Sequence, residues 1–207
     1  MKDYFEEINQ NFDNTLAGEG FNSPNDLQAA VLKRIKQGGD LLVIAPKESG
    51  KTYAAMLAMM LKCPTPQEGS PRVLYMGDDN EEIVEMAKKM TLVTRRTELF
   101  IEVADSKGKM IQQRIFIFQG ADVVIGNAKR MYDLYIQNGL NLNKIQLLIV
   151  DDADKFMTER AMAEMVRISE GLPKCQRIFF IEKRTPRVER VLPRFLNHPM
   201  VIDLTAE

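Results

Sequence analysis

Residues 40–62 read DLLVIAPKESGKTYAAMLAMMLK, and this stretch decides the fold. It begins with an apolar run at 40–45, passes through a short loop that ends in Ser49-Gly50-Lys51-Thr52, and continues as a run of good helix formers. A loop between a strand and a helix start directs backbone N–H groups and the positive end of the helix dipole to one point, where phosphate groups bind. The stretch therefore predicts a buried strand, a phosphate-binding loop and a helix.

The loop matches the second half of the fingerprint G-x-x-x-x-G-K-[ST], while Ala45 stands at its first glycine. In that fingerprint the lysine, here Lys51, reaches the outer phosphates, and the hydroxyl of Thr52 binds Mg²⁺. Glu48 places a carboxylate in the loop, which would repel phosphates unless it points to solvent, and it lacks the backbone freedom of glycine. The alternative interpretation is a lysine that lies near a helix start by coincidence. The context of strand, loop and helix favours the phosphate site.

Six further apolar runs predict strands, and helix-forming segments alternate with them. The strands are expected at 72–77, 98–104, 121–126, 145–152, 177–182 and 199–204, and the helices at 51–62, 80–90, 106–118, 128–138, 159–170 and 187–196. Most of the apolar runs are continuous, as in a parallel sheet with helices on both faces. The pattern predicts an α/β fold with a mostly parallel sheet of about seven strands, in a single domain at 1–207. The turn-rich segment 63–71 is too short to link two domains.

The run at 145–152 ends in two carboxylates, Asp151 and Asp152, within the sequence IQLLIVDDADKF. In open α/β sheets, ligands bind outside the carboxyl ends of the strands, so this strand end and the loop are expected to share one site. Asp151 would bind Mg²⁺ directly or through water, and Asp152 would lie where a base positions the attacking water. Alone, the pair is equally typical of an acidic helix cap. Together with the upstream loop, it indicates a nucleotide site.

The composition excludes several classes of protein. The formal net charge is −1, so the domain as a whole is not basic. Nucleic-acid binding would therefore need a local patch of basic residues. Cys63 and Cys175 have no metal-binding spacing and are typical of reduced intracellular thiols. The polar start MKDYFEEINQNF is no signal peptide, and no apolar run is long enough to cross a membrane. We therefore expect an intracellular protein without membrane partners, in the cytoplasm or nucleus, with the cytoplasm favoured.

From about Tyr4 to Leu204 the chain resembles the first, N-terminal RecA-like lobe of the DEAD-box RNA helicases, in a divergent form. The matching segments are GFNSPNDLQ at 20–28, similar to the family's Q motif, APKESGKT at 45–52, DDAD at 151–154 in place of DEAD, ADVVIGNAKRMYDLY at 121–135 and PRVERVLPRFLNHPMVI at 186–202. Their order and spacing follow the family. The resemblance implies a RecA-like P-loop domain that binds ATP and Mg²⁺.

The resemblance also implies roles for single residues. It implies ATP contacts from Phe5, Phe21, Gln28, Pro46, Lys47, Glu48, Ser49, Gly50, Lys51 and Thr52, catalytic roles for Lys51, Asp151 and Asp152, metal binding by Thr52 and Asp151, and RNA contacts from Asn80, Lys129 and Arg130. Within that set, Gln28 would hydrogen-bond the adenine edge, and Phe5 would stack on the adenine ring. For the basic pair Lys129 and Arg130, the alternative interpretation is an ordinary solvated face.

Departures from the family concentrate in the RNA-contact and coupling segments. Glu48 replaces a glycine of the loop, and Asp152 replaces a glutamate whose side chain is one methylene longer, in a role where about 1 Å of misplacement matters. The stretch matching P-T-R-E-L reads DDNEE at 78–82, the Gly-Gly turn reads DS at 105–106, and S-A-T reads IEK at 181–183. The added acids oppose contact with an RNA backbone. Nucleotide contacts are thus retained better than RNA contacts.

The sequence leaves three hypotheses open. The first is the ATP-binding lobe of a divergent DEAD-box ATP-dependent RNA helicase, which acts on RNA together with a second RecA-like lobe that this chain lacks. Alone it would hydrolyse ATP very slowly or not at all, because the second lobe supplies arginines that stabilise the transition state. The second is a catalytically degenerate scaffold with weak or no ATP turnover that binds protein or RNA, for example in a small-RNA pathway. The third is a P-loop NTPase of another family with coincidental Q-motif residues.

Overall fold

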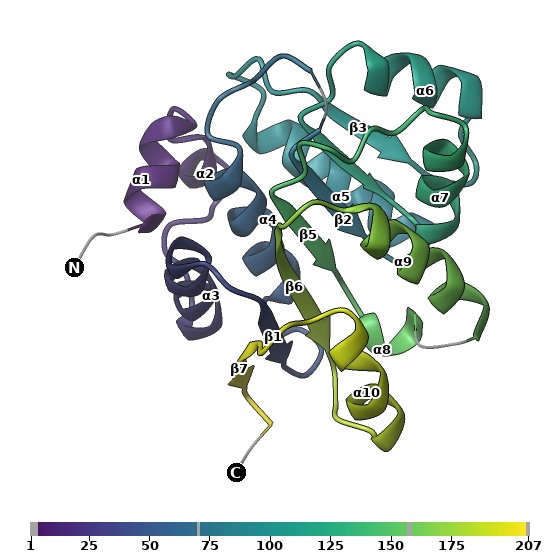
Figure 1. The fold of residues 1–207 in the computed structure, drawn as a ribbon. Coiled ribbons are helices and arrows are strands. Elements are labelled where there is room, and N and C mark those ends of the chain that lie inside the picture. Colours follow the sequence, from purple (N-terminus) through teal and green to yellow (C-terminus); the bar gives the residue numbers. More distant parts are fainter. Residues whose placement is uncertain (1–3, 70, 157–158, 206–207) are drawn as a thin grey trace.

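The computed structural model describes residues 4–69, 71–156 and 159–205, so the expected domain bounds 1 and 207, and Ser70 of the segment 63–71, lie outside the described residues. At the centre is a seven-stranded sheet whose neighbouring strands are all parallel, in the order β3-β4-β2-β5-β6-β1-β7 (Figure 1). The strands are β1 (Leu41–Ile44), β2 (Val73–Met76), β3 (Ile101–Ala104), β4 (Val123–Gly126), β5 (Leu147–Val150), β6 (Gln176–Ile181) and β7 (Met200–Asp203). The predicted α/β fold and its seven strands are confirmed.

The helices between the strands lie within a few residues of their predicted positions. They are α4 (Lys51–Lys62), α5 (Asn80–Val93), α6 (Met110–Phe118), α7 (Ala128–Ile136), α9 (Glu159–Gly171) and α10 (Pro186–Val191), with the short helix α8 (Ala153–Phe156) in addition. The predicted helix 187–196 gives way to a 3₁₀ turn, η1 (Leu192–Arg194), because Pro193 has no N–H to donate. Helix α6 starts later than predicted, since Asp105 accepts the N–H of Gly108 at 2.8 Å and holds a turn there.

Three helices before β1 have no counterpart among the predicted elements. They are α1 (Tyr4–Asn11), α2 (Thr15–Gly18) and α3 (Asp26–Gln37). Helix α3 begins with a capping box, in which Asn25 and Gln28 exchange hydrogen bonds of 2.8 and 2.9 Å. Its buried residues Leu27, Val31 and Ile35 recur every four positions, a period that is typical of a helix with one face in the core. The Q-motif segment therefore leads into a helix.

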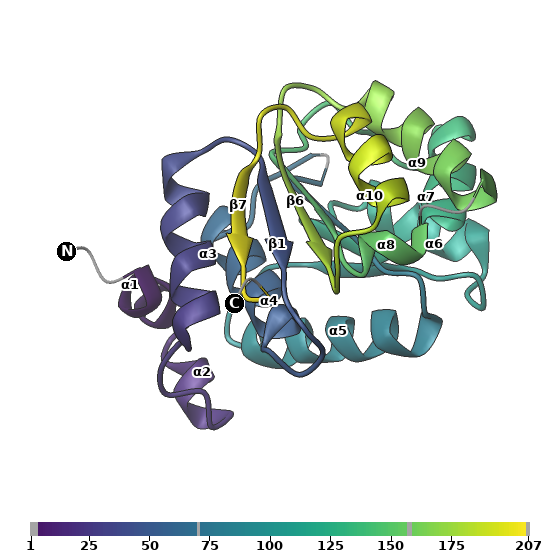
Figure 2. The same cartoon turned by 90° about the horizontal axis from the view of Figure 1, so that it is seen from below.

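Helices cover both faces of the sheet (Figure 2). Helices α1, α3, α4 and α5 pack on one face, and α7, α9 and α10 pack on the other. Alternate residues of a strand enter different cores, as Val43 and Ile44 do in β1. Strands β1, β2, β4 and β5 are buried along their whole length, which explains why their sequences are continuous apolar runs.

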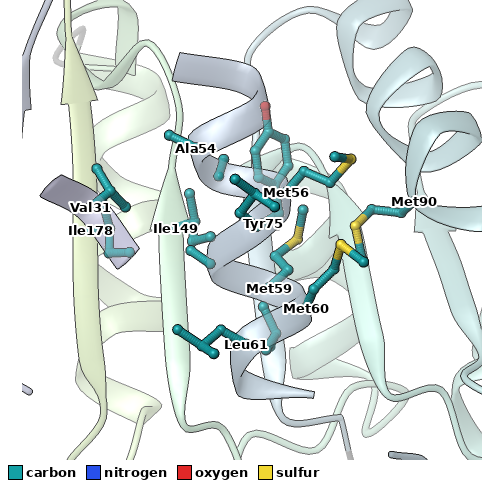
Figure 3. Packing of buried hydrophobic residues seen from close by; sticks show 14 of the residues in the cluster. Val31, Ala54, Met56, Met59, Met60, Leu61, Tyr75, Met90, Ile149 and Ile178 are labelled. Atoms are coloured by element: carbon teal, nitrogen blue, oxygen red, sulfur yellow. The ribbon is translucent and has the colours of Figure 1, made fainter. Parts of the chain in front are cut away.

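Methionines fill the core between α4, α5 and the sheet (Figure 3). Met56, Met59, Met60 and Met90 are buried around Tyr75, where their flexible side chains fill an irregular space. Among the described residues, no helix combines the length and the apolar character needed to span a membrane.

Candidate nucleotide site

The loop between β1 and α4 wraps around the side chain of Lys51. This residue is only 8% exposed, and its Nζ donates to the carbonyl oxygens of Ala45 at 2.7 Å and Pro46 at 3.1 Å. Two left-handed residues shape the loop, Glu48 with φ of 61° and Gly50 with φ of 96°. For a non-glycine residue this left-handed conformation costs about 1–2 kcal/mol of free energy. Glu48 therefore adopts a strained backbone conformation within the turn.

The Q-motif segment 20–28 lies directly against this loop. Asn25 donates through Nδ2 to the carbonyl of Ser49 at 3.0 Å, and Gln28 donates through Nε2 to the carbonyl of Gly50 at 3.3 Å. A Cβ at position 50 would lie 2.7 Å from both of these amide nitrogens, and the left-handed backbone of Gly50, with φ of 96°, also favours glycine. Gln28 is buried, and it ties the start of α3 to the phosphate loop.

An aromatic stack joins the N-terminal segment to α4. Phe5 is buried, with its ring centroid 5.5 Å from that of Phe21. Phe21 in turn stacks on Tyr53, with 5.0 Å between centroids and 11° between ring planes. The ammonium of Lys89 in α5 lies 5.5 Å from the centroid of Tyr53. Phe5 and Phe21 are thus neighbours, and Tyr53, which the sequence analysis did not assign to the site, links this aromatic cluster to α5.

The acidic pair follows β5, at the same edge of the sheet as the loop. Tyr75, on the neighbouring strand β2, donates its hydroxyl to Asp151 Oδ2 at 2.7 Å, and the N–H of Asp152 donates to Asp151 Oδ1 at 3.0 Å. Burial raises the pKa of the Asp151 carboxyl, and the hydrogen bond from Tyr75 opposes that rise. Asp152 instead forms an ion pair with Lys155, at 2.7 Å between Oδ2 and Nζ. The two carboxylates are therefore held by different partners.

Loop and acidic pair meet at a cavity of about 320 Å³. The cavity is lined by Lys47, Glu48, Lys51 and Thr52 from the loop and the start of α4, by Tyr75, Glu82, Glu85, Met86 and Lys89 from β2 and α5, and by Asp151, Asp152 and Lys155 after β5. Hydroxyl and carboxylate oxygens are the donors that Mg²⁺ prefers, and lysines bind phosphate oxygens. Among the residues described, no three His, Cys, Asp or Glu side chains are arranged to hold a metal, so Mg²⁺ here would take further ligands from phosphate and water. The lining fits a polyphosphate with Mg²⁺.

Not every predicted ATP contact lines this cavity. Phe5, Phe21 and Gln28 lie outside it, at the Q-motif side of the loop. The predicted loop contacts Pro46, Ser49 and Gly50 do not line it either. A larger cavity of about 660 Å³ lies at the opposite edge of the sheet, at the amino ends of β1 and β6, where Asp40 and Arg177 contribute to its lining. It contains none of the predicted site residues. Because ligands of open α/β sheets bind at the carboxyl ends, the smaller cavity is the candidate site.

Two of the three predicted RNA-contact residues belong to one hydrogen-bonded network. Asn80 donates through Nδ2 to Ser106 Oγ at 3.0 Å, and Arg130 donates through Nη2 to the carbonyl of Ser106 at 2.9 Å. These residues follow β2, β4 and β3, so they lie at the same sheet edge as the cavity. Lys129 is separate and forms an ion pair with Asp133 along α7, at 2.7 Å. The structure joins Asn80 and Arg130 but not Lys129.

Three residues that the sequence analysis did not assign support these sites. Asn127 donates through Nδ2 to Asn80 Oδ1 at 3.1 Å and caps α7, a role that its place between a strand and a helix could have indicated. Lys155 follows Asp152 by three positions, a spacing that brings side chains together on a helix. Tyr75 and Asp151 are 76 positions apart, and no local pattern connects them.

The all-parallel strand order, with a glycine-containing loop after β1 and an acidic pair after β5 at one edge, is that of a RecA-like lobe. Two solved structures share this fold. One is Saccharomyces cerevisiae Dbp5 bound to RNA and ADP BeF3, with a TM-score of 0.83 and 18% identity over 97% of this chain and 52% of that chain. The other is a DEAD box protein from Methanococcus jannaschii, with a TM-score of 0.82 and 19% identity over 93% of this chain and 53% of that chain.

The chain belongs to the DEAD/DEAH box helicase family, whose model matches residues 25–181. It is 25% identical over 188 residues to the ATP-dependent RNA helicase DeaD of Haemophilus influenzae, covering 89% of this chain and 30% of that protein. It is also 25% identical over 201 residues to the ATP-dependent RNA helicase RhlB of Shewanella baltica, covering 93% of this chain and 46% of that protein. The chain therefore spans less than half the length of these relatives.

Proposed function

We propose that this chain is the ATP-binding lobe of a divergent DEAD-box RNA helicase. The observation that carries the proposal is the cavity in which Lys51 and Thr52 line one side and Asp151 lines another. Lys51 and the loop N–H groups would hold the outer phosphates, while Thr52 and Asp151 would hold Mg²⁺. When bound, Mg²⁺ neutralises charge that develops on the phosphates. The names of the relatives, which are ATP-dependent RNA helicases, support the assignment.

The base of the nucleotide is proposed to lie at the Q-motif side of the loop. Gln28 donates a hydrogen bond to Gly50, and Phe5 and Phe21 are in contact with each other outside the phosphate cavity. In this arrangement Gln28 would contact the adenine edge, and the aromatic side chains would contact its ring face. The exposed loop residues Pro46 and Lys47, together with Ser49, would complete the contacts along the phosphates.

The lobe is proposed to bind ATP better than it hydrolyses ATP. Asp152 stands at the position of the catalytic base, and its carboxylate is engaged by Lys155 at 2.7 Å. A base must reach the water that it deprotonates, and a short side chain held by a lysine reaches less far. A second RecA-like lobe of the same protein would supply the groups that complete the site, in keeping with the greater length of the relatives.

Part of an RNA-binding surface is proposed at the network of Asn80 and Arg130. Both residues already donate hydrogen bonds to Ser106, so RNA binding by this edge should be weak. The acids Asp78 and Asp79 at the same edge oppose a phosphate backbone. These acids, together with the ion pair on Asp152, favour the second candidate function, a helicase-like scaffold that binds RNA or protein with little or no ATP turnover.

Calorimetric titration of the chain with ATP in the presence of Mg²⁺ tests the proposal. We expect saturable binding with a Kd below about 1 mM, which corresponds to about 4 kcal/mol of binding free energy. Phosphate release, measured in the same samples, should stay near the uncatalysed background, because residues 1–207 would supply only one of the two lobes that form a complete site. Absence of binding at millimolar ATP would overturn the proposal and leave the scaffold function.

Glu48→Gly is expected to strengthen the binding of ATP with Mg²⁺ about tenfold. The carboxylate of Glu48 lines the cavity, and its removal relieves repulsion of about 1–2 kcal/mol at the phosphates. Glycine also relieves the strain of the left-handed backbone, so the free energy of unfolding should rise by about 1 kcal/mol. Calorimetry measures the first effect, and urea unfolding measures the second.

Glu48→Gln is the matched control, because it removes the charge and keeps the backbone strain. It should strengthen nucleotide binding like Glu48→Gly but leave the free energy of unfolding close to that of the wild type. If both variants bind the nucleotide no better than the wild type, the side chain of Glu48 does not face the phosphates.

A further inference from the structure

Tyr75 places a polar group at the end of an otherwise apolar strand. It lies on β2, is 3% exposed, and its strand neighbours Leu74 and Met76 are apolar and buried. Figure 3 shows its ring among the methionines beside α4, with the hydroxyl oxygen towards the end of α4 at which Ala54 lies. That end is the start of α4, which follows the phosphate loop. The ring therefore belongs to the core, and the hydroxyl reaches the edge of the candidate site.

The hydroxyl of Tyr75 forms a hydrogen bond with Asp151. It donates to Oδ2 at 2.7 Å, while Oδ1 accepts the N–H of Asp152 at 3.0 Å. Strand pairing fixes the geometry, because Tyr75 is in register with Ile149, two positions before Asp151 on the adjacent strand. Each oxygen of the Asp151 carboxylate thus accepts a hydrogen bond from a different donor, one on strand β2 and one in the turn that follows β5. Rotation of this carboxylate about its side-chain bonds is restricted before any metal binds.

We propose that Tyr75 is a positioning residue, which orients Asp151 for binding the Mg²⁺ that accompanies the nucleotide. The proposal rests on the proposed function of this site. A carboxylate that is already oriented loses less freedom on binding the metal, and hydrogen-bond partners of metal ligands typically contribute 10–100-fold to metal affinity. A buried tyrosine hydroxyl usually finds a hydrogen-bond partner whether or not a metal binds nearby. A purely structural role is therefore the competing explanation for the bond between Tyr75 and Asp151.

Tyr75→Phe separates the two explanations, since phenylalanine keeps the ring and removes only the hydroxyl. The dissociation constant of ATP is measured by calorimetry with Mg²⁺ and with EDTA, and the ratio of the two constants gives the enhancement by Mg²⁺. We expect Tyr75→Phe to lower this enhancement about tenfold and to leave binding in EDTA within about twofold of the wild type. Tyr132→Phe, at a partly buried tyrosine of α7 outside the cavity, is the matched control and should change neither value.

Each outcome has a distinct meaning. If the wild type shows no enhancement by Mg²⁺, the proposed metal site fails, and the role of Tyr75 fails with it. If the wild type shows the enhancement and Tyr75→Phe retains it, only the positioning role is overturned. Circular dichroism establishes that the variant is folded. A second comparison uses Asp151→Asn, in whose background Tyr75→Phe should cause no further loss of the Mg²⁺ enhancement; a further tenfold loss there would overturn the positioning role as well.

Discussion

Asp122→Ala is expected to lower the free energy of unfolding by about 3–5 kcal/mol, the cost of removing one partner of a buried ion pair. Arg72 and Asp122 precede the neighbouring strands β2 and β4, with 2.6 Å between Nη2 and Oδ1, and their side chains are 3% and 2% exposed. Asp122 also accepts the backbone N–H groups of Gln67 at 3.0 Å and Phe100 at 3.1 Å. Without the carboxylate, Arg72 remains as a buried charge and two backbone donors lose their acceptor. Urea unfolding followed by circular dichroism measures the loss.

Glu19→Ala provides the comparison for a solvent-exposed pair. Glu19 contacts Arg95 at 2.6 Å, with side chains that are 29% and 43% exposed, and such pairs typically contribute less than about 1 kcal/mol. We therefore expect Asp122→Ala to lower the free energy of unfolding by at least about 2 kcal/mol more than Glu19→Ala does. If the two variants lose the same free energy of unfolding, the buried Arg72–Asp122 pair stabilises the fold no more than an exposed pair does.

Lys51→Ala is expected to weaken the binding of ATP with Mg²⁺ about 30–150-fold, because charge-assisted hydrogen bonds of this kind contribute about 2–3 kcal/mol. The ammonium of Lys51 already points into the loop, where it donates to the carbonyls of Ala45 and Pro46. A bound phosphate would share or replace these acceptors. Calorimetric titration of the wild type and the variant gives the ratio of dissociation constants.

Two checks make this result interpretable. Lys33→Ala removes an exposed lysine of α3 that does not line the cavity, and it should leave the affinity unchanged. Urea unfolding shows whether the loop variant keeps the fold, since Lys51 also bridges two loop carbonyls. An affinity of the folded Lys51→Ala variant equal to that of the wild type would place the nucleotide elsewhere on the protein.

The sheet and the phosphate loop could be predicted from sequence because their signals are local. A strand buried on both faces is a continuous apolar run, and β1, the loop and α4 follow one another without a gap. The predicted start and end of α4, at Lys51 and Lys62, are those observed. The helical period of α3 is also a local signal, carried by Leu27, Val31 and Ile35, although most of this helix lies beyond the Q-motif segment 20–28.

The remaining parts of the site depend on which strands are neighbours. Tyr75 meets Asp151 only because β2 lies beside β5, and Asn80 meets Ser106 only because β2 and β3 flank β4. Strand order is set by the packing of helices on both faces of the sheet, and no local sequence pattern predicts it. The conformation of Glu48 is a further case, since its residue type argues against a left-handed turn that the surrounding loop imposes.

Amide resonances of the isotope-labelled chain, recorded while ATP and Mg²⁺ are added, test the central claim most directly. We expect the largest shifts on Ser49, Gly50 and Thr52 in the loop and on Asp151 after β5. The amide of Arg177, beside the larger cavity at the opposite edge of the sheet, should not move. Shifts confined to that opposite edge, or no shifts at millimolar nucleotide, would contradict the assignment of this chain as an ATP-binding lobe.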